Sequence, residues 1–267
     1  MAVSAELRVE DLSFGYGGKP IGREVGFALE PGEVICLLGP NGGGKTTLFK
    51  TMLGLLRPLG GRVTLGGADI AGWKRETLAR QIAYVPQAHS AFFPFTVRDI
   101  VLMGRASRVG LFTTPGAADR KAAEAALAAL GIDRLADRAY TEISGGERQL
   151  TLIARALAQE PRVLVMDEPT ASLDFGNQIR VLEKVRGLAR TGIAVLLSTH
   201  DPDHAFLCAD RVALLHEGRL HALGTPADVV TAGALRLLYG VEVEIVTIPG
   251  SGPGSGRRIC VPSLAAF

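Results

Sequence analysis

Short apolar runs alternate along the chain with segments whose apolar residues recur at helical spacing. Residues 34–38, 163–166 and 193–198 are apolar except for the last residue, Ser198, and contain β-branched side chains. Runs of this kind are typical of strands that are buried on both faces, as in a parallel sheet. Residues 7–14 instead alternate apolar and polar positions, and this period of two predicts a strand with one exposed face.

Helices are predicted between these strands. The segments with helical spacing or helix-forming composition are residues 46–56, 121–130, 147–159 and 178–189, and most of 89–160 has this character. Pro58 and Pro161 lie just beyond two of these segments, where a proline ends a helix. The Gly-rich residues 250–256 are expected to form a flexible loop before a short tail.

Turn residues complete the pattern. Gly66-Gly67 predicts a hairpin over residues 62–70, and Glu217-Gly218 predicts another over 211–222. Because strands alternate with helices, we expect an α/β fold with a mostly parallel sheet and right-handed crossovers. The early strand and hairpin add an antiparallel β subdomain, and the middle of the chain adds a helical insert.

Composition narrows the classes of protein. Of the 267 residues, 47% are hydrophobic and 21% are charged, which argues against disorder. The formal net charge of +2 gives no basic excess of the kind that marks a nucleic-acid binder. The three cysteines lie far apart, which fits a reducing compartment and excludes a disulfide scaffold. No uncharged apolar run reaches 18 residues, so we expect no membrane span.

The strongest chemical motif is a glycine-rich loop between a predicted strand and a predicted helix. It fits the pattern G-x4-G-K-[ST] and consists of Gly39, Pro40, Asn41, Gly42, Gly43, Gly44, Lys45 and Thr46. Such glycines let backbone N–H groups converge on a phosphate, and the helix N-terminus adds partial positive charge. Lys45 would reach the terminal phosphates, and Thr46 would offer its hydroxyl to Mg²⁺. The alternative, an ordinary glycine-rich turn, does not account for the lysine and threonine at these positions.

Two acids end the second apolar run. Asp167 and Glu168 follow residues 163–166 directly, at the strand end where open α/β sheets bind ligands. Asp167 would hold Mg²⁺, mostly through water, and Glu168 would polarise an attacking water as a general base. A solvated strand end explains such a pair equally well when it is taken alone. Together with the glycine-rich loop, it favours a P-loop NTPase core.

A second helix start has a similar character. Ser144, Gly145 and Gly146 open the predicted helix that contains Glu147, and their N–H groups would form another phosphate-binding end. A plain serine N-cap with a flexible lead-in is the competing interpretation. One P-loop needs no second helix start of this kind, so this motif requires a separate explanation.

In this order, the motifs resemble those of the ATP-binding subunits of ABC transporters, over essentially the whole chain. The matching positions are Tyr16, the loop from Gly39 to Thr47, Gln87, residues 143–149, 166–169 and 172–174, and His200. Position 147 is Glu where Gln is commoner in the family, and position 43 is Gly where Ser, Ala or Cys is commoner. The first departure leaves open which hydrogen bond Glu147 makes to nucleotide.

The resemblance implies an ABC ATPase fold that binds ATP and Mg²⁺. We expect a single domain over residues 1–267, with a helical subdomain at about 89–160 and a C-terminal tail at about 241–267. The implied ATP-binding residues are Tyr16, Gly39, Pro40, Asn41, Gly42, Gly43, Gly44, Lys45, Thr46, Thr47, Ser144, Gly145, Gly146, Glu147 and Asp174. The implied metal ligands are Thr46, Gln87 and Asp167, and the implied catalytic residues are Glu168, His200 and Gln87.

Without the resemblance, the single residues have simpler interpretations. Tyr16 and Gln87 would be exposed side chains, and His200 would belong to a helix start. The remaining histidines, His204 among them, lack ligand-like spacing and are expected to be structural or solvated. The apolar cluster at residues 92–95 either packs in the helical insert or forms a groove for a short coupling helix of a membrane subunit.

The resemblance also implies partners. A second copy of the chain would form a head-to-tail homodimer beneath two polytopic permease subunits, at the cytoplasmic face of the inner membrane, with a substrate-binding protein outside. Residues 84–104 and 143–176 most resemble the branch that imports iron–siderophore, haem, cobalamin and molybdate. The expected cargo is a metal chelate. The alternatives are a molybdate or tungstate importer, a non-transport ABC ATPase, and a protein that binds ATP without hydrolysing it.

Overall fold

The computed structural model describes residues 6–87, 94–109, 113–249 and 256–263. A central sheet has the strand order β10-β9-β3-β8-β7-β6. Its strands are β3 (Val34–Leu38), β6 (Ile82–Val85), β7 (Val163–Met166), β8 (Ala194–Thr199), β9 (Arg211–His216) and β10 (Arg219–Gly224). All neighbouring pairs are parallel except β9 and β10. The expected parallel sheet is confirmed, and its inner strands β3, β7 and β8 are buried along their whole length.

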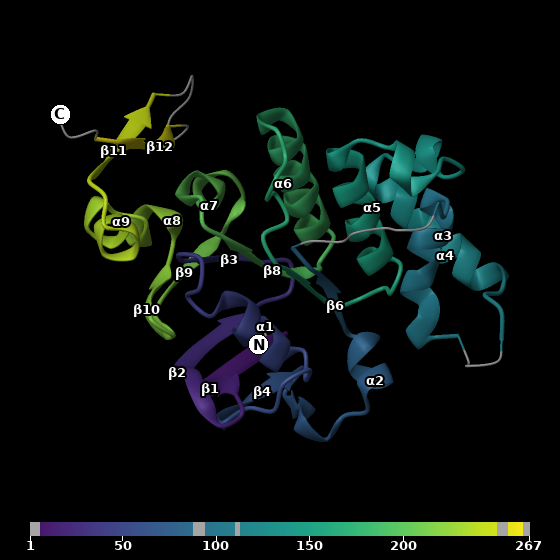
Figure 1. The fold of residues 1–267 in the computed structure, drawn as a ribbon, viewed down its shortest axis with the longest axis horizontal. Helices are drawn as coiled ribbons and strands as arrows, with labels where there is room; N and C mark the ends of the chain where they lie inside the picture. Colours follow the sequence, from purple (N-terminus) through teal and green to yellow (C-terminus); the bar gives the residue numbers. More distant parts are fainter. Residues whose placement is uncertain (1–5, 88–93, 110–112, 250–255, 264–267) are drawn as a thin grey trace.

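A second, antiparallel sheet has the order β2-β1-β4-β5. Its strands are β1 (Leu7–Tyr16), β2 (Lys19–Leu29), β4 (Gly60–Leu65) and β5 (Ala68–Asp69). Helix α1 (Lys45–Met52) lies between this sheet and the central one, and Phe14 and Phe49 are fully buried in the shared core. Figure 1 shows α1 and the antiparallel sheet on one side of the central sheet and α6 and α7 on the other.

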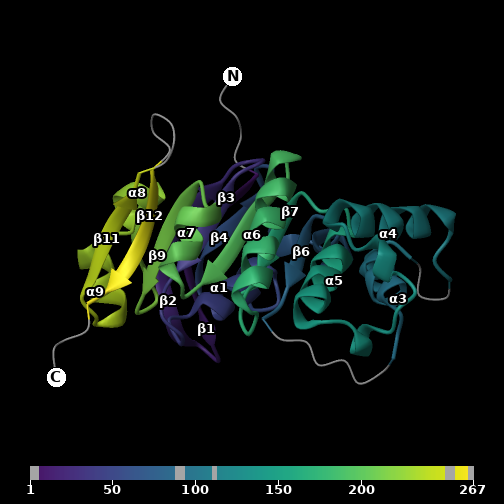
Figure 2. The same cartoon turned by 90° about the horizontal axis from the view of Figure 1, so that it is seen from above.

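The helical insert forms one end of the molecule. Helices α3 (Val97–Leu102), α4 (Ala117–Leu130) and α5 (Gly145–Leu157) pack on one another, and Figure 2 shows them opposite the C-terminal strands. The other α-helices are α2 (Arg75–Ala79), α6 (Phe175–Arg190), α7 (Pro202–Cys208), α8 (Pro226–Val229) and α9 (Ala232–Tyr239). The 3-10 helices are η1 (Ile70–Gly72), η2 (Met103–Ser107), η3 (Asp133–Leu135) and η4 (Tyr140–Glu142). No helix in the described ranges is long and apolar enough to cross a membrane.

The last part of the chain corrects a sequence-based expectation. Residues after about 241 were expected to form a tail, yet β11 (Val243–Ile248) pairs antiparallel with β12 (Arg257–Pro262). Both segments contain β-branched residues, but the segment between them is too long for a tight turn and hides the hairpin pattern. The expected loop at 250–256 lies almost wholly outside the described residues. Helix α9 was also not predicted, and α1 ends at Met52 rather than at 56.

Candidate phosphate and metal site

The glycine-rich loop joins β3 to α1 and depends on the absence of side chains. A Cβ on Gly39 would overlap the backbone carbonyl oxygen of Leu215, which cannot move aside. Gly44 is the N-cap of α1 with φ at 95°, a conformation that favours glycine, and no side chain caps the helix. No side chain therefore competes with an anion for the first N–H groups of α1.

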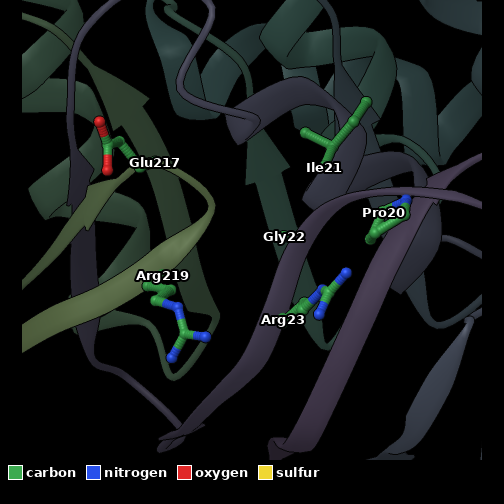
Figure 3. Close-up of a pocket in the computed structure, with 6 residues that line it drawn as sticks. All are labelled: Pro20, Ile21, Gly22, Arg23, Glu217 and Arg219. Atoms are coloured by element: carbon green, nitrogen blue, oxygen red, sulfur yellow. The ribbon is translucent and has the colours of Figure 1, made fainter.

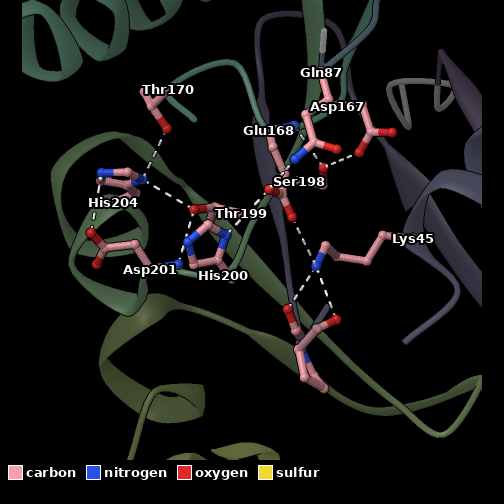
Figure 4. Close-up of polar contacts among 12 residues, drawn as sticks. Lys45, Gln87, Asp167, Glu168, Thr170, Ser198, Thr199, His200, Asp201 and His204 are labelled. Atoms are coloured by element: carbon pink, nitrogen blue, oxygen red, sulfur yellow. Dashed lines mark hydrogen bonds and ion pairs between the residues drawn. The ribbon is translucent and has the colours of Figure 1, made fainter. Parts of the chain in front are cut away.

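Lys45 is buried, being only 5% exposed, at the start of α1. Its Nζ donates to the carbonyl oxygens of Gly39 at 2.7 Å and Pro40 at 3.1 Å. It also lies 3.2 Å from Glu168 Oε1, as Figure 4 shows. A buried ammonium is stable only with such partners, so the loop carbonyls and Glu168 together fix the charge beside the helix N-terminus.

Asp167 directly follows β7 and is held from both sides. Thr46 Oγ1 donates to Asp167 Oδ2 at 2.6 Å, and Ser198 Oγ at the end of β8 donates to Oδ1 at 2.6 Å. The Tyr84 hydroxyl of β6 lies 3.4 Å from Oδ2, and burial, with the nearby Asp167 carboxylate, raises the pKa of Tyr84. The carboxyl ends of three neighbouring strands thus supply this cluster. Sequence reasoning missed Ser198, whose only signal is a polar residue near the end of an apolar strand.

Glu168 is the point at which distant segments meet. Glu168 Oε1 contacts Lys45, as described above. Glu168 Oε2 accepts a hydrogen bond from Gln87 Nε2 at 2.9 Å and lies 3.3 Å from His200 Nδ1. Its backbone N–H donates to Ser198 Oγ at 2.9 Å, and its φ of 47° is strained for a residue other than glycine. The strained backbone and the side-chain contacts together hold one carboxylate against a lysine, an amide and an imidazole.

The donor set fits Mg²⁺. Thr46 Oγ1 and Asp167 Oδ2 are hard oxygen donors 2.6 Å apart, beside the loop where phosphates would bind. Magnesium is usually held in this way, by one or two protein oxygens together with substrate phosphates and water. Within the described ranges, no group of three or more His, Cys, Asp and Glu side chains could form a metal site by itself. Gln87, the third expected ligand, hydrogen-bonds to Glu168 rather than to Asp167.

These observations agree with comparisons to known proteins. The family model described as ABC transporter matches residues 23–171, more than half of the chain. The chain is an ATPase of the ABC transporter family. An uncharacterised ABC transporter ATP-binding protein of Haemophilus influenzae is 44% identical to it, over 92% of this chain and 95% of that protein.

Two further matches name a cargo class for the proteins concerned. The hemin import ATP-binding protein HmuV of Nocardia farcinica is 43% identical, over 86% of this chain and 79% of that protein. A solved metal-chelate type ABC transporter in an inward-facing conformation has 33% identity and a TM-score of 0.86, covering 98% of both chains. The match over both full lengths confirms the ABC ATPase fold.

The surface around Tyr16 is less enclosed than the P-loop cluster. Tyr16 ends β1 and is 46% exposed. A cavity of about 220 Å³ lies between β2 and the β9–β10 turn (Figure 3), and its lining residues are Pro20, Ile21, Gly22, Arg23, Glu217 and Arg219. Ile21 also adjoins the P-loop, since a Cβ on Gly44 would lie 3.1 Å from Ile21 Cγ2. Sequence reasoning did not single out Ile21, because a lone apolar residue in a strand carries no chemical signal.

Residues 143–149, which match the signature motif of ABC ATPases, contain the start of α5 and lie apart from the P-loop at residues 39–47. Ser144 and Glu147 form a capping box, in which Ser144 Oγ accepts from Glu147 N and Glu147 Oε2 accepts from Ser144 N. Hydrogen bonds from the backbone and side chain of Ser144 lower the pKa of Glu147, and Arg134 lies 3.0 Å from its carboxylate. Among the described residues, no hydrogen bond or ion pair joins 144–147 to 39–47.

Residues 172–174, which match the D-loop of ABC ATPases, end in another local helix cap. Asp174 is the N-cap of α6 and accepts from Asn177 N at 2.9 Å, and this hydrogen bond lowers the pKa of Asp174. The hydrogen bonds of Asp174 that the structure describes are therefore local, like those of the signature motif, and do not reach the P-loop cluster. Of the apolar cluster at 92–95, Phe92 and Phe93 lie outside the described residues, and Phe95 is 44% exposed.

Proposed function

We propose that the chain is the ATP-hydrolysing subunit of an importer for a metal chelate. The observation that carries hydrolysis is the environment of Glu168: a buried carboxylate within 3.3 Å of a lysine, an amide and an imidazole. A chain that only bound ATP would not need this arrangement beyond the P-loop. The names of the relatives, hemin import protein and metal-chelate type transporter, support the cargo class.

Glu168 would act as the general base. A water bound between Glu168 and the γ-phosphorus of ATP would give its proton to the carboxylate as its oxygen attacks phosphorus, and the bond to the β-phosphate oxygen would break. Lys45 would exchange its contacts with the loop carbonyls for phosphate oxygens, and His200 would donate to the γ-phosphate. Mg²⁺ would be held by Thr46, Asp167 and Gln87 and would neutralise charge on the phosphates.

We propose a homodimer for the remaining half of the site. The start of α5 offers the N–H groups of Gly145 and Gly146, and α5 lies on the side of the molecule away from α1 (Figure 2). It can therefore face a nucleotide on a second copy, with Ser144, Glu147 and the D-loop Asp174 from one chain and the P-loop from the other. Tyr16 would stack on the adenine ring.

The assembly would lie at the cytoplasmic face of the membrane. Two permease subunits would supply the pathway and an external binding protein would deliver the cargo, with the chain acting as one ATPase domain. Phe95 is exposed at the helical insert and would belong to the surface that meets a permease subunit.

The test is the isosteric variant Glu168→Gln. It keeps the shape and the contact with Gln87 but removes the base. We expect ATP binding to remain and turnover to fall on the order of 10²–10⁴-fold, the usual contribution of a general base. Hydrolysis at the wild-type rate would refute the assignment. For the cargo, a deletion strain would be tested for uptake of iron chelates, haem, cobalamin and molybdate. Normal uptake of all four, with a defect in the transport of another kind of molecule, would refute the cargo class.

A further inference from the structure

A second histidine lies behind the site and has no role in the chemistry above. His204 is in the first turn of α7 and is 6% exposed. Its Nδ1 lies 3.0 Å from Thr199 Oγ1 and 3.3 Å from Thr170 Oγ1, and its Nε2 lies 3.3 Å from Asp201 Oδ2. Figure 4 shows these three neighbours around the ring. The sequence left open whether His204 is structural or solvated. A buried ring with a polar partner on each side is structural.

The three partners flank the two residues that would carry out hydrolysis. Thr199 and Asp201 are the immediate neighbours of His200, and Thr170 lies two positions after Glu168. His204 therefore contacts both sides of the loop that carries His200. It also contacts the loop that carries Glu168.

A neutral ring with its proton on Nε2 fits the contacts of this cluster. Nε2 lies 3.3 Å from the Asp201 carboxylate, and Nδ1 would accept from the Thr199 hydroxyl at 3.0 Å, with the Thr170 hydroxyl beside it at 3.3 Å. Thr199 Oγ1 also accepts from the backbone N–H of Asp201 at 3.0 Å, which leaves the Thr199 hydroxyl proton for His204. Burial lowers the pKa of His204, in keeping with a neutral ring.

Both catalytic residues depend on the backbone around them. The His200 side chain is 51% exposed, so its position depends on the backbone on either side of it. The strained backbone of Glu168 likewise needs support from the residues that follow it. The contacts of His204 supply such support to both.

We propose that His204 is a positioning residue that holds the loops of His200 and Glu168 in a fixed relation for ATP hydrolysis. The inference rests on the proposed function of those two residues. It goes beyond that function because His204 would touch neither ATP nor the attacking water. Its removal should slow the chemical step and leave ATP binding almost unchanged.

The experiment measures kcat and KM for ATP in the full-length chain, with rates normalised to the amount of nucleotide bound. His204→Leu removes all three polar contacts, and Thr170→Val removes one hydroxyl while keeping the shape. We expect each to lower kcat about tenfold, the scale of a small misplacement of catalytic groups, with KM changed less than about twofold. The conservative variants His204→Asn, which keeps an acceptor near the position of Nδ1, and Thr170→Ser should restore most of the rate.

A double variant shows whether the two residues act through one contact. If His204→Leu and Thr170→Val break the same contact, their combination should be no slower than the slower single variant. Additive losses would overturn the inference. His221→Leu, which changes an exposed histidine of β10, is the matched control and should keep the wild-type rate.

The variant Glu168→Gln distinguishes a failure of the His204 proposal from a failure of the proposed function. If Glu168→Gln loses turnover while His204→Leu and Thr170→Val keep the wild-type kcat, the positioning role of His204 is wrong and the proposed function stands. If Glu168→Gln itself turns over normally, both fail. Should His204→Leu not fold, Thr170→Val still decides the outcome, since valine keeps the size and shape of threonine.

Discussion

Polar residues gather at two places in this molecule: the edge of the central sheet beside the P-loop, here called the P-loop edge, and the start of α5. The two places differ in where their hydrogen-bond and ion-pair partners come from. At the P-loop edge, Lys45, Asp167 and Glu168 are buried, and Glu168 and its Gln87 partner are 81 positions apart in sequence. At the start of α5, Ser144 and Glu147 satisfy each other across three positions, and the nearby Arg134 side chain is 70% exposed.

The difference follows from burial. A buried charge has no water to bond, so its partners must come from wherever the fold brings them. An exposed helix start can be capped locally and needs no other part of the chain. Substitutions at the P-loop edge should therefore affect both stability and activity. Substitutions at the start of α5 should affect activity and change stability little.

The largest contrast is expected between Lys45→Ala and Ser144→Ala. Lys45→Ala leaves the buried Glu168 carboxylate without its ammonium partner and should lower the free energy of unfolding by about 3–5 kcal/mol. Ser144→Ala loses one N-cap, worth about 1 kcal/mol. Chemical denaturation of both variants measures their free energies of unfolding. Equal losses of this free energy in the two variants would contradict the comparison. Both should impair ATP turnover, Lys45→Ala by on the order of 10²-fold or more.

Two glycines give a smaller contrast of the same kind. Gly39→Ala places a methyl group against the backbone carbonyl of Leu215, whereas Gly146→Ala meets the side chain of Asn177. The Asn177 atoms met include Cβ at 2.9 Å, so relief at Gly146 requires a small shift of the start of α6. Because the exposed end of a helix can shift more easily than a central strand backbone, we expect losses of about 3 and about 1 kcal/mol, respectively. Gly72→Ala, with open space around it, is the control. A loss for Gly146→Ala as large as that for Gly39→Ala would show that Asn177 is fixed.

The smallest expected effect is the dependence of stability on pH. Burial lowers the pKa of His204 below its ordinary value of 6.5 in the folded chain. The unfolded chain then binds a proton that the folded chain does not, so this contribution to stability is complete above about pH 6.5 and is lost as the pH falls toward the folded pKa. Unfolding titrations between about pH 5 and 7.5 should show a flatter dependence for His204→Asn than for the wild type. An unchanged slope would argue against a neutral buried ring.

The sequence predicted those parts of the fold and site that depend on local patterns. The apolar runs predicted β3 and β7 with their observed bounds, and the glycine-rich loop predicted the start of α1 within one residue. Asp167 and Glu168 could be placed at a strand end because they follow an apolar run directly. The hairpin turn at Glu217-Gly218 also lies as expected.

The rest depends on contacts between distant segments. Nothing in the residues around Ser198, Ile21 or His204 indicates that the fold brings them to the P-loop cluster or behind it. The family resemblance implied that Gln87 is a metal ligand, and spacing alone would have left it on the surface. Its contact with Glu168 was not predicted. Local patterns predict where elements begin and end, while the partners of buried polar groups follow only from the three-dimensional arrangement.

The central claim is that a complete ATP site takes its P-loop from one chain and its signature motif from another. Mixing Lys45→Ala chains with Ser144→Arg chains tests it directly by ATPase activity. Each variant alone should be inactive, and the mixture should regain activity that rises with the product of the two concentrations, because each heterodimer contains one intact composite site. Absence of rescue in a mixture that forms heterodimers, or full activity in a verified monomer of the wild type, would contradict the account.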